Sequence, residues 1–286
     1  MNLTDRIYLA VHIGLTLLLC ARHEYLARWP YLVAWNLAAM AAILLLARGQ
    51  RKSAAWEFAH DFLPGFVFFT TVFEEVALLC LTVRGQWQNQ HLVALESTLF
   101  AVPPLVWLHR SVPGWGVELL QFGYFAFYPI YPVVGLLFWS WRKKPGWQNA
   151  FRDMTDALSI GYLICYAVFI ALPTQSPRHA GNIVPAGQTG PFGWLIGLIQ
   201  SSGGVHGNAF PSAHIMLAFV VLVFAIRYWR RVAPWLMVIN VLMCLGAVYD
   251  SYHYAVDVVA GAILGTVVGI AYLRCATSKR ASHFSV

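Results

Sequence analysis

The sequence predicts an all-helical integral membrane protein with about eight transmembrane helices. Of its 286 residues, 59% are hydrophobic and only 11% are charged, where an ordinary soluble domain has about 45–50% and about 25%. The apolar residues gather in long segments, and a helix needs about 20 of them to cross a bilayer. This composition excludes a soluble globular enzyme, a disordered scaffold and a nucleic-acid-binding protein.

Eight apolar segments are long enough, or nearly long enough, to span a membrane. They are 6–21, 30–47, 62–83, 115–141, 157–173, 210–229, 233–250 and 255–274. Arg22, His23 and Glu24 follow the first segment where a signal peptide would have small residues, so we interpret it as a retained helix. The fourth segment contains Pro129 and Pro132, which predict a kink. Two long connections, 85–114 and 174–209, complete a chain that reads as one domain.

The basic residues predict the topology. Eight spans place both termini on one side of the membrane, and that side collects 14 of the 19 Lys and Arg residues. The other side has Arg22, Arg28, Arg84, Arg110 and Arg178. The excess of Lys and Arg in cytoplasmic loops then predicts cytoplasmic termini. Residues 174–209 and 251–254 would face the periplasm or a lumen, and the absence of organelle signals favours a bacterial inner membrane.

Three polar motifs lie on this predicted outer side. Residues 172–178 read Leu-Pro-Thr-Gln-Ser-Pro-Arg, at the end of the fifth span. Residues 207–214 read Gly-Asn-Ala-Phe-Pro-Ser-Ala-His and lead into the sixth span. Residues 250–257 read Asp-Ser-Tyr-His-Tyr-Ala-Val-Asp and join the last two spans.

The second motif has the features of a phosphate-binding helix start. Pro211 suits a first helical turn, because the amide hydrogen that it lacks would be unbonded there. Gly207 and Asn208 form a permissive loop before it. Free amides at a helix N-terminus favour an anion such as phosphate. Ser212 adds a hydroxyl donor, and His214 can supply a proton from the same turn.

The third motif supplies a candidate nucleophile. His253 and Asp257 are four residues apart, which places them on one face of a helix. Asp257 can then accept a hydrogen bond from one ring nitrogen of His253 and leave the other nitrogen free to attack. Arg178, in the first motif, can place a bidentate guanidinium on phosphate oxygens. The three motifs together therefore indicate a phosphoryl-transfer site.

At these residues the sequence resembles the type 2 phosphatidic acid phosphatase superfamily. Its members share a six-helix core and three motifs, K-x6-R-P, P-S-x-H and S-R-x5-H-x3-D. The second motif matches at Pro211, Ser212 and His214, and the third matches at His253 and Asp257. The resemblance implies a six-helix catalytic core over 62–274, a two-helix addition over 1–61 and a cytoplasmic tail over 275–286.

The resemblance also implies a mechanism. His253 would form a phosphohistidine, Asp257 would orient it, and His214 would protonate the leaving oxygen. Phosphate would be bound by Arg178 and by residues of the second motif, namely Ser212, Gly207 and Asn208. No metal and no cofactor are implied, and the partners would be a phospholipid or lipid phosphate and the surrounding membrane lipids.

Two departures from the family pattern indicate the branch. Ala171 stands where the first motif has Lys, and Gly246 and Ala247 stand where the third has Ser-Arg. Fewer cations favour a phosphodiester over a dianionic monoester. The pattern is similar to the inositol phosphorylceramide synthase branch, with which the chain shares three further features: Pro173, Pro177 and Arg178; Phe210 to His214; and His253, Tyr254 and Asp257. Members of that branch pass a phosphoryl head group from one lipid to another lipid's hydroxyl, which makes ceramide or diacylglycerol an expected acceptor.

Several polar residues lie inside the predicted spans and could be functional or structural. Glu74 and Glu75 lie near the middle of the third span, where a carboxylate is costly and faces protein or water. They could line a head-group pocket, or bond to neighbouring helices. Glu118, at the outer end of the fourth span, could hydrogen-bond a polyol head group. Asn36 is expected to make a helix–helix hydrogen bond.

Three other functions stay open at this level. The first is a plain phosphatase acting on phosphatidic acid or an isoprenyl phosphate. The second is a lipid-translocating membrane protein that retains the fold without turnover. The third is a zinc site built from His214, His253 and Asp257, since these residue types bind zinc. The sequence predicts no oligomeric state.

Overall fold

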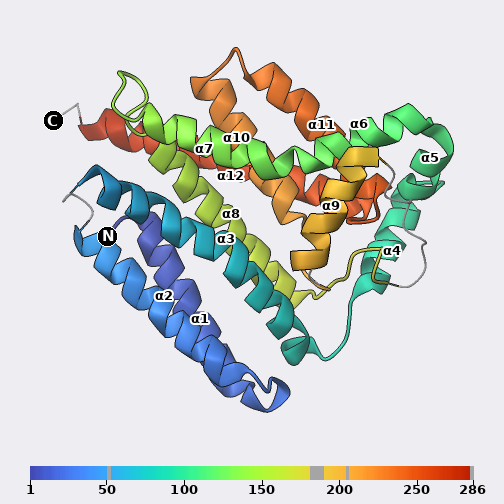
Figure 1. Cartoon of the computed structure of the whole chain (residues 1–286), viewed down its shortest axis with the longest axis horizontal. Helices are drawn as coiled ribbons and strands as arrows, with labels where there is room; N and C mark the ends of the chain where they lie inside the picture. Colours follow the sequence, from blue (N-terminus) through green and yellow to red (C-terminus); the bar gives the residue numbers. More distant parts are fainter. Residues whose placement is uncertain (50–52, 181–189, 204–205, 284–286) are drawn as a thin grey trace.

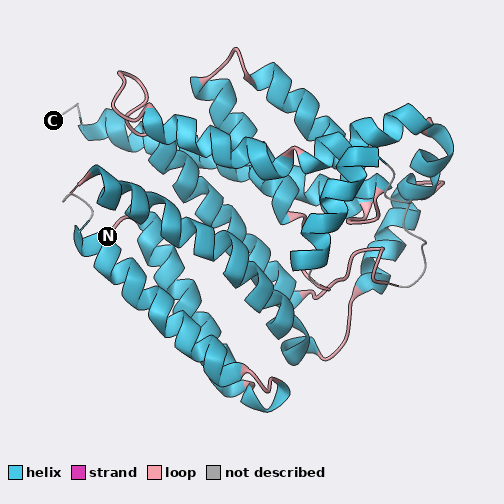
Figure 2. Cartoon of the chain, in the orientation of Figure 1, coloured by secondary structure: helices cyan, strands magenta, loops and turns pink. Residues whose placement is uncertain are grey.

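The computed structural model describes residues 1–49, 53–180, 190–203 and 206–283, and the regular elements in these ranges are helices (Figure 2). A short 3-10 helix, His23–Tyr25, follows the first α-helix. The α-helices are α1 (Leu3–Ala21), α2 (Trp29–Gly49), α3 (Ala54–Arg84), α4 (Asn89–Leu99), α5 (Pro104–Ser111), α6 (Gly114–Phe125), α7 (Phe127–Ser140), α8 (Ala150–Ala171), α9 (Gly190–Gly203), α10 (Ala213–Tyr228), α11 (Ala233–Tyr249) and α12 (Ala255–His283).

The described helices confirm the predicted fold class and a multi-pass membrane protein. Six spans are long and apolar enough to cross a bilayer: α1, α2, α3, α6 with α7, α8 and α12. Two shorter apolar helices, α10 and α11, bring the number to the predicted eight. The pair α4 and α5, bent by 61° at its break, would add one more if it crosses. Both termini lie at the same end of the bundle (Figure 1).

The predicted kink in the fourth span is found as an interruption between α6 and α7. The break falls at Ala126. Pro129 and Pro132 follow within the first two turns of α7, and Pro129 has no amide hydrogen to bond back to Phe125 across the break. The interruption therefore has the predicted cause, although it begins three residues before the first proline.

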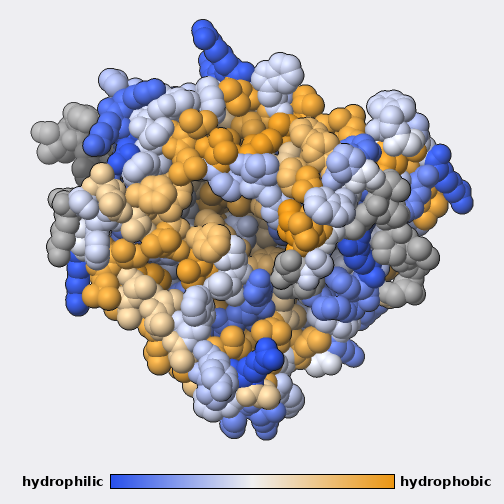
Figure 3. All heavy atoms as spheres, in the orientation of Figure 1, coloured by the Kyte–Doolittle hydropathy of each residue, from blue (hydrophilic) through white to orange (hydrophobic). Residues whose placement is uncertain are grey.

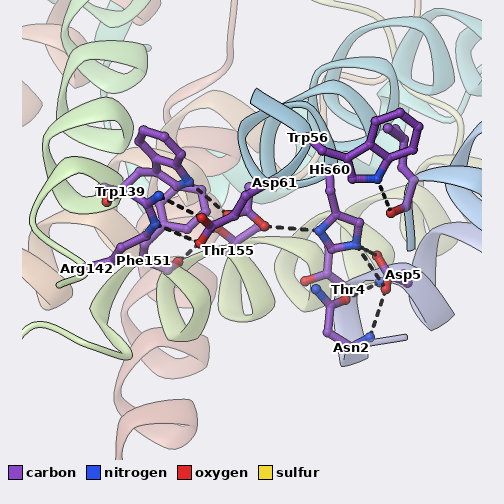
Figure 4. A network of polar contacts seen from close by, with 12 residues as sticks. Asn2, Thr4, Asp5, Trp56, His60, Asp61, Trp139, Arg142, Phe151 and Thr155 are labelled. Carbon is purple, nitrogen blue, oxygen red and sulfur yellow. Dashed lines mark hydrogen bonds and ion pairs between the residues drawn. The ribbon is translucent and has the colours of Figure 1, made fainter. Parts of the chain in front are cut away.

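Two helices begin earlier than predicted, because their first turns carry charges that the structure pairs. α3 starts at Ala54 rather than at residue 62, and α8 starts at Ala150 rather than at 157. In α3, His60 lies 3.1 Å from Asp5 of α1 and 3.1 Å from Asp61 (Figure 4). The predicted boundary between 1–61 and the core therefore falls inside α3, and the division of the chain into addition, core and tail stays a prediction.

The same polar network fixes the ends of four helices near the termini. Arg142 donates two hydrogen bonds of 2.9 Å to the Glu57 carboxylate, and the Trp139 indole donates to Asp61 at 2.8 Å (Figure 4). Thr4 of α1 donates to Asp156 of α8. These contacts join α1, α3, α7 and α8 at the end of the bundle opposite the three motifs.

Close backbone contact between α10 and α12 positions the second and third motifs. A Cβ atom at Gly261 would lie 2.5 Å from the Ser212 carbonyl oxygen, and one at Gly265 would lie 2.2 Å from that of Met216. Small residues four apart allow this approach inside a membrane. The start of α10 is therefore held directly against the first turns of α12.

A buried hydrogen-bond chain joins the first three helices, as expected for Asn36. The Asn36 amide donates to Glu75 at 2.7 Å, and its oxygen contacts Nδ1 of His12. All three side chains are buried. Glu75 therefore bonds to neighbouring helices, which is the structural one of its two interpretations.

Candidate active site

The three motifs meet at one end of the bundle. Thr174, in the first motif, accepts hydrogen bonds from two amides of the second, through its carbonyl from Ala209 (3.2 Å) and through its hydroxyl from Phe210 (3.0 Å). The amide of Arg178 donates to the carbonyl of Ser251 in the third motif at 3.1 Å. Segments far apart in the sequence therefore form one continuous hydrogen-bonded cluster.

His253 lies at the centre of this cluster with both ring nitrogens engaged. Its Nε2 is 3.0 Å from Oγ of Ser212, and its Nδ1 is 3.1 Å from the carbonyl oxygen of Ala209. The Asp257 carboxylate lies 3.4 Å from the same Nδ1. A carbonyl only accepts, so Nδ1 carries the proton and Nε2 presents a lone pair to the Ser212 hydroxyl. This tautomer leaves the unprotonated lone pair of the ring on Nε2.

The pairing of His253 with Asp257 differs from the predicted helix face. His253 precedes α12, which begins at Ala255. Asp257 lies in the first turn of α12, and its carboxylate accepts the amide hydrogen of Tyr254 at 2.9 Å. The loop therefore folds back over the helix start, and this return, rather than a helical repeat, brings His253 beside the carboxylate.

The predicted phosphate-binding amides are only partly free. The prediction that Pro211 lies in the first helical turn is wrong, because α10 begins at Ala213 and Pro211 precedes it. Ser212 is the N-cap, and its hydroxyl accepts the amide of Ile215 at 3.4 Å. Its own amide, however, donates to the carbonyl of Asp257 at 3.0 Å. Ser212 can therefore offer phosphate its hydroxyl, but its amide is used by the contact between α10 and α12.

A cavity of about 210 Å³ opens beside His253. One side is formed by His253, His214 and the loop residues Gly207, Asn208 and Ala209. The other side is formed by α3, α6, α7 and α9. The apolar face of the molecule is hollowed near its centre, between α3 and α6–α7 (Figure 3). The site therefore opens on the surface that faces lipid.

His214 lies across the cavity from His253. Its ring is between those of Phe73 and Phe127, with centroids 5.9 and 4.7 Å away, and 6.5 Å from the ring of His253. The two imidazoles therefore line the same cavity.

The family follows from a match over this part of the chain. A family model described as the PAP2 superfamily matches residues 90–272, more than half of the chain and all of the three motifs. The chain belongs to the PAP2 superfamily. Neither a curated protein nor a solved structure gives a significant match. Membership assigns the protein a phosphatase or phosphotransferase type of function on lipid phosphates.

The residues that depart from the PAP2 motifs are closely packed or have backbone groups engaged in hydrogen bonds. Gly246 packs against α6, where a Cβ atom would lie 2.4 Å from the carbonyl oxygen of Leu120. Ala247 is buried, and its carbonyl accepts the amides of Tyr252 and His253. Ala171 ends α8, and its carbonyl accepts from Arg84 at 2.9 Å. Close packing of α6 and α11 therefore leaves no room for a larger residue at 246.

Arg178 belongs to the cluster but not to the lining of the cavity. Its guanidinium lies 4.3 Å from the centre of the Tyr252 ring and donates to the Tyr252 hydroxyl and the Asp250 carbonyl. Tyr252 in turn stacks on Tyr124 of α6. Burial raises the pKa of the neighbouring Asp250 carboxyl to about 6, against the influence of Gln121 and Arg178. In this structure Arg178 holds the loop that carries His253.

The three glutamates have different surroundings. Glu118, in α6, reaches the start of α9, where its carboxylate accepts the amide of Phe192 at 3.5 Å. Glu75 is turned to Asn36, away from the site. Glu74 lines the cavity. Only one of the three carboxylates predicted for a head-group pocket is therefore part of the pocket next to His253.

Two further residues of the site lie in or directly after the first motif. Thr174 is fully buried and joins the first motif to the second. His179 lines the cavity and bonds to Ser176, and its ring centroid lies 4.2 Å from that of His206. Burial and the neighbouring His206 and Arg178 lower the pKa of His179. Thr174 could have been suspected from its place inside the first motif.

Proposed function

We propose that the protein is a metal-independent lipid phosphotransferase that works through a phosphohistidine on His253. The observation that carries this proposal is the state of the His253 ring. His253 lines the cavity, Nδ1 is hydrogen-bonded to Ala209, and Nε2 has a lone pair directed to a hydroxyl that can move away. This is the arrangement of an activated nucleophile with an orienting group behind it.

The neighbouring residues supply the remaining roles. When a phosphate ester enters, the Ser212 hydroxyl turns from Nε2 to a phosphoryl oxygen, and Nε2 attacks phosphorus. His214 gives its proton to the leaving oxygen from the opposite side of the space. Asp257 stabilises the positive charge that develops on the ring. Gly207 and Asn208 line the phosphoryl end, where the loop lies close to the substrate.

The charges around the cavity favour a phosphodiester donor. Among the described residues, neither a Lys nor an Arg lines the cavity, and Arg178 is bonded to the 250–252 loop. A diester carries one negative charge where a monoester carries nearly two, so it needs less compensation. This supports a donor phospholipid and the inositol phosphorylceramide synthase type of reaction over hydrolysis of phosphatidic acid.

The arrangement of helices supports an extracytoplasmic site. The three motifs lie at the end of the bundle opposite both termini (Figure 1). Most Lys and Arg residues lie in the loops at the terminal end, which favours cytoplasmic termini. We therefore infer that the site faces the periplasm of a bacterial inner membrane, or an equivalent lumen.

Product analysis tests the proposal directly. The purified protein is incubated in mixed micelles with phosphatidylinositol, phosphatidic acid, ceramide and diacylglycerol, with and without EDTA. We expect a new head-grouped lipid by mass spectrometry, in equal amount with the chelator. Free phosphate from phosphatidic acid without a transfer product would instead make the protein a plain phosphatase. Loss of activity in EDTA would contradict metal independence, and no product from any lipid would contradict turnover.

The pH profile of kcat/KM should not show the loss of activity near pH 6.5 that protonation of an ordinary histidine would cause. Burial lowers the pKa of His253 to about 4, against the hydrogen bond to Ala209. The reactive neutral ring is therefore present above about pH 4 and is lost as the pH falls through that value. With a diester donor, which does not titrate here, the loss of kcat/KM on acidification should therefore be centred near pH 4 and not near pH 6.5. A fall centred near pH 6.5 would show that His253 has an ordinary pKa in the free enzyme.

A further inference from the structure

The cavity has a second half that the phosphoryl chemistry does not use. Its wall is the face of α3 that carries Phe69, Thr70, Phe73 and Glu74, opposite Tyr128 of α7. Four of these five side chains are neutral, and three are aromatic. Glu74 is the one charged group on that wall among the described residues.

Glu74 lies deep in the membrane without a partner. Ten residues separate it from Arg84, the last residue of α3, which is about 15 Å along the helix axis and about half of a hydrocarbon core of about 30 Å. Its side chain is exposed, and it makes no hydrogen bond or ion pair with another described residue. A carboxylate at this depth is costly unless it faces water, protein or a ligand.

The adjacent residue Glu75, at the same depth in the membrane, has a structural role. Glu75 is 2% exposed and accepts a hydrogen bond from Asn36. It therefore stabilises the contact of α3 with α2, whereas Glu74 is directed to the cavity. The two neighbouring glutamates of α3 therefore have different surroundings. The packing of α3 against α2 accounts for the position of Glu75 but not for a carboxylate at Glu74.

The chemistry of the second half excludes another phosphate. Carboxylate and phosphate oxygens both accept hydrogen bonds, so the natural ligand of Glu74 is a hydroxyl or another donor. The aromatic wall favours an apolar body beside that hydroxyl. Since the cavity opens on the apolar, lipid-facing surface (Figure 3), such a molecule can enter sideways from the membrane. These features fit a neutral lipid alcohol better than a free polyol.

We propose that Glu74 binds the hydroxyl of a lipid acceptor and holds it beside the phosphorylated His253. The inference rests on the proposed function and names its second substrate. In the transfer step, the acceptor oxygen forms a bond to phosphorus and the P–Nε2 bond breaks, with its electron pair returning to His253. The acceptor's proton moves to His214, which gave up a proton to the donor's leaving oxygen. Glu74 accepts a hydrogen bond throughout and is not itself changed.

The test compares Glu74→Ala, Glu74→Gln and Glu75→Gln with the wild type. Donor cleavage is followed as phosphoenzyme formation in a single turnover, and transfer is followed with diacylglycerol, ceramide or glycerol as the acceptor. For Glu74→Ala we expect kcat/KM for the lipid acceptor to fall about 10- to 30-fold, with donor cleavage unchanged within twofold. Glu74→Gln should recover part of the loss, because its amide oxygen still accepts. Glu75→Gln should leave the acceptor's kcat/KM unchanged.

Each outcome decides one point. Unchanged acceptor kinetics in Glu74→Ala, with normal donor cleavage, would overturn the assignment of Glu74 alone. A Glu74-dependent transfer to glycerol but not to either lipid would overturn the lipid acceptor. Absence of a phosphoenzyme in the wild type would overturn the proposed function, and this inference with it. Thermal unfolding separates these results from misfolding, since the isosteric Glu74→Gln variant should keep the wild-type midpoint.

Discussion

His253→Ala should abolish both phosphoenzyme formation and lipid transfer. In enzymes with an activated nucleophile, removal of that residue costs on the order of 10⁶ in kcat, and we expect a loss of this size here. The reason is geometric, because His253 lines the cavity and its Nε2 lone pair is bonded only to the Ser212 hydroxyl, which can move away. Single-turnover labelling with a radioactive donor measures the loss directly.

A matched control separates the chemistry from a general effect of losing a histidine. His91 is exposed on α4, near the same end of the bundle, and does not line the cavity. His91→Ala should keep wild-type turnover and the wild-type unfolding midpoint. If His253→Ala retained a labelled enzyme, the nucleophile would have to be another residue of the site.

Ser212 is the residue that such a result would point to. Ser212, His253 and Asp257 are also arranged as a hydrolytic triad, with hydroxyl, imidazole and carboxylate in line. However, Ser212 is 0% exposed and its hydroxyl caps α10, whereas His253 lines the cavity, so we expect His253 to be the nucleophile. A phosphohistidine is labile in acid, whereas a phosphoserine is stable there. Acid treatment of the labelled enzyme therefore distinguishes the two nucleophiles.

Much of the fold could be predicted from the sequence, because membrane spans are determined by length and apolarity. The predicted eight segments correspond to eight helical spans, and their errors lie where charged residues extend a helix. The starts of α3 and α8 contain His60, Asp61 and Asp156, which read as loop residues in the sequence. Their pairing across helices, which makes the extension stable, is a tertiary property.

The motifs that form the site could be predicted from the sequence, but the positions of their side chains relative to the cavity could not. The order of the motifs indicated that they meet, and the structure brings them together through Thr174 and the contact of Gly261 with Ser212. Whether Arg178 faces the cavity or Tyr252 depends on how the 250–254 loop folds, which no spacing determines. The different surroundings of Glu74 and Glu75 likewise depend on which face of α3 packs against α2.

Asp257→Asn should lower kcat on the order of 10³-fold while leaving donor binding nearly unchanged. Loss of a comparable carboxylate costs about 10⁴ where the histidine then adopts the wrong tautomer. Here the Ala209 carbonyl still accepts from Nδ1, so we expect the tautomer to persist. What is lost is the negative charge that stabilises the ring as Nε2 attacks, a contribution of about 10²–10³ when made by one fixed group.

The helix cap determines how the new amide is oriented. In the native chain one carboxylate oxygen of Asp257 accepts from Tyr254, and the other is buried without a hydrogen bond. An asparagine that placed its NH₂ toward Tyr254 would set donor against donor, so its oxygen should keep that position. The substitution thus removes charge and little else from the geometry around His253.

A buried carboxylate far from the site provides the control for this variant. Asp156 accepts hydrogen bonds from Thr4 and Tyr272 and is 4% exposed. Asp156→Asn should lower the unfolding midpoint without changing kcat, whereas Asp257→Asn should slow phosphoenzyme formation at an unchanged donor KM. Wild-type turnover in Asp257→Asn would mean that Asp257 only caps α12. A loss near 10⁴ would mean that Ala209 alone does not hold the tautomer, because only loss of the reactive lone pair on Nε2 costs that much.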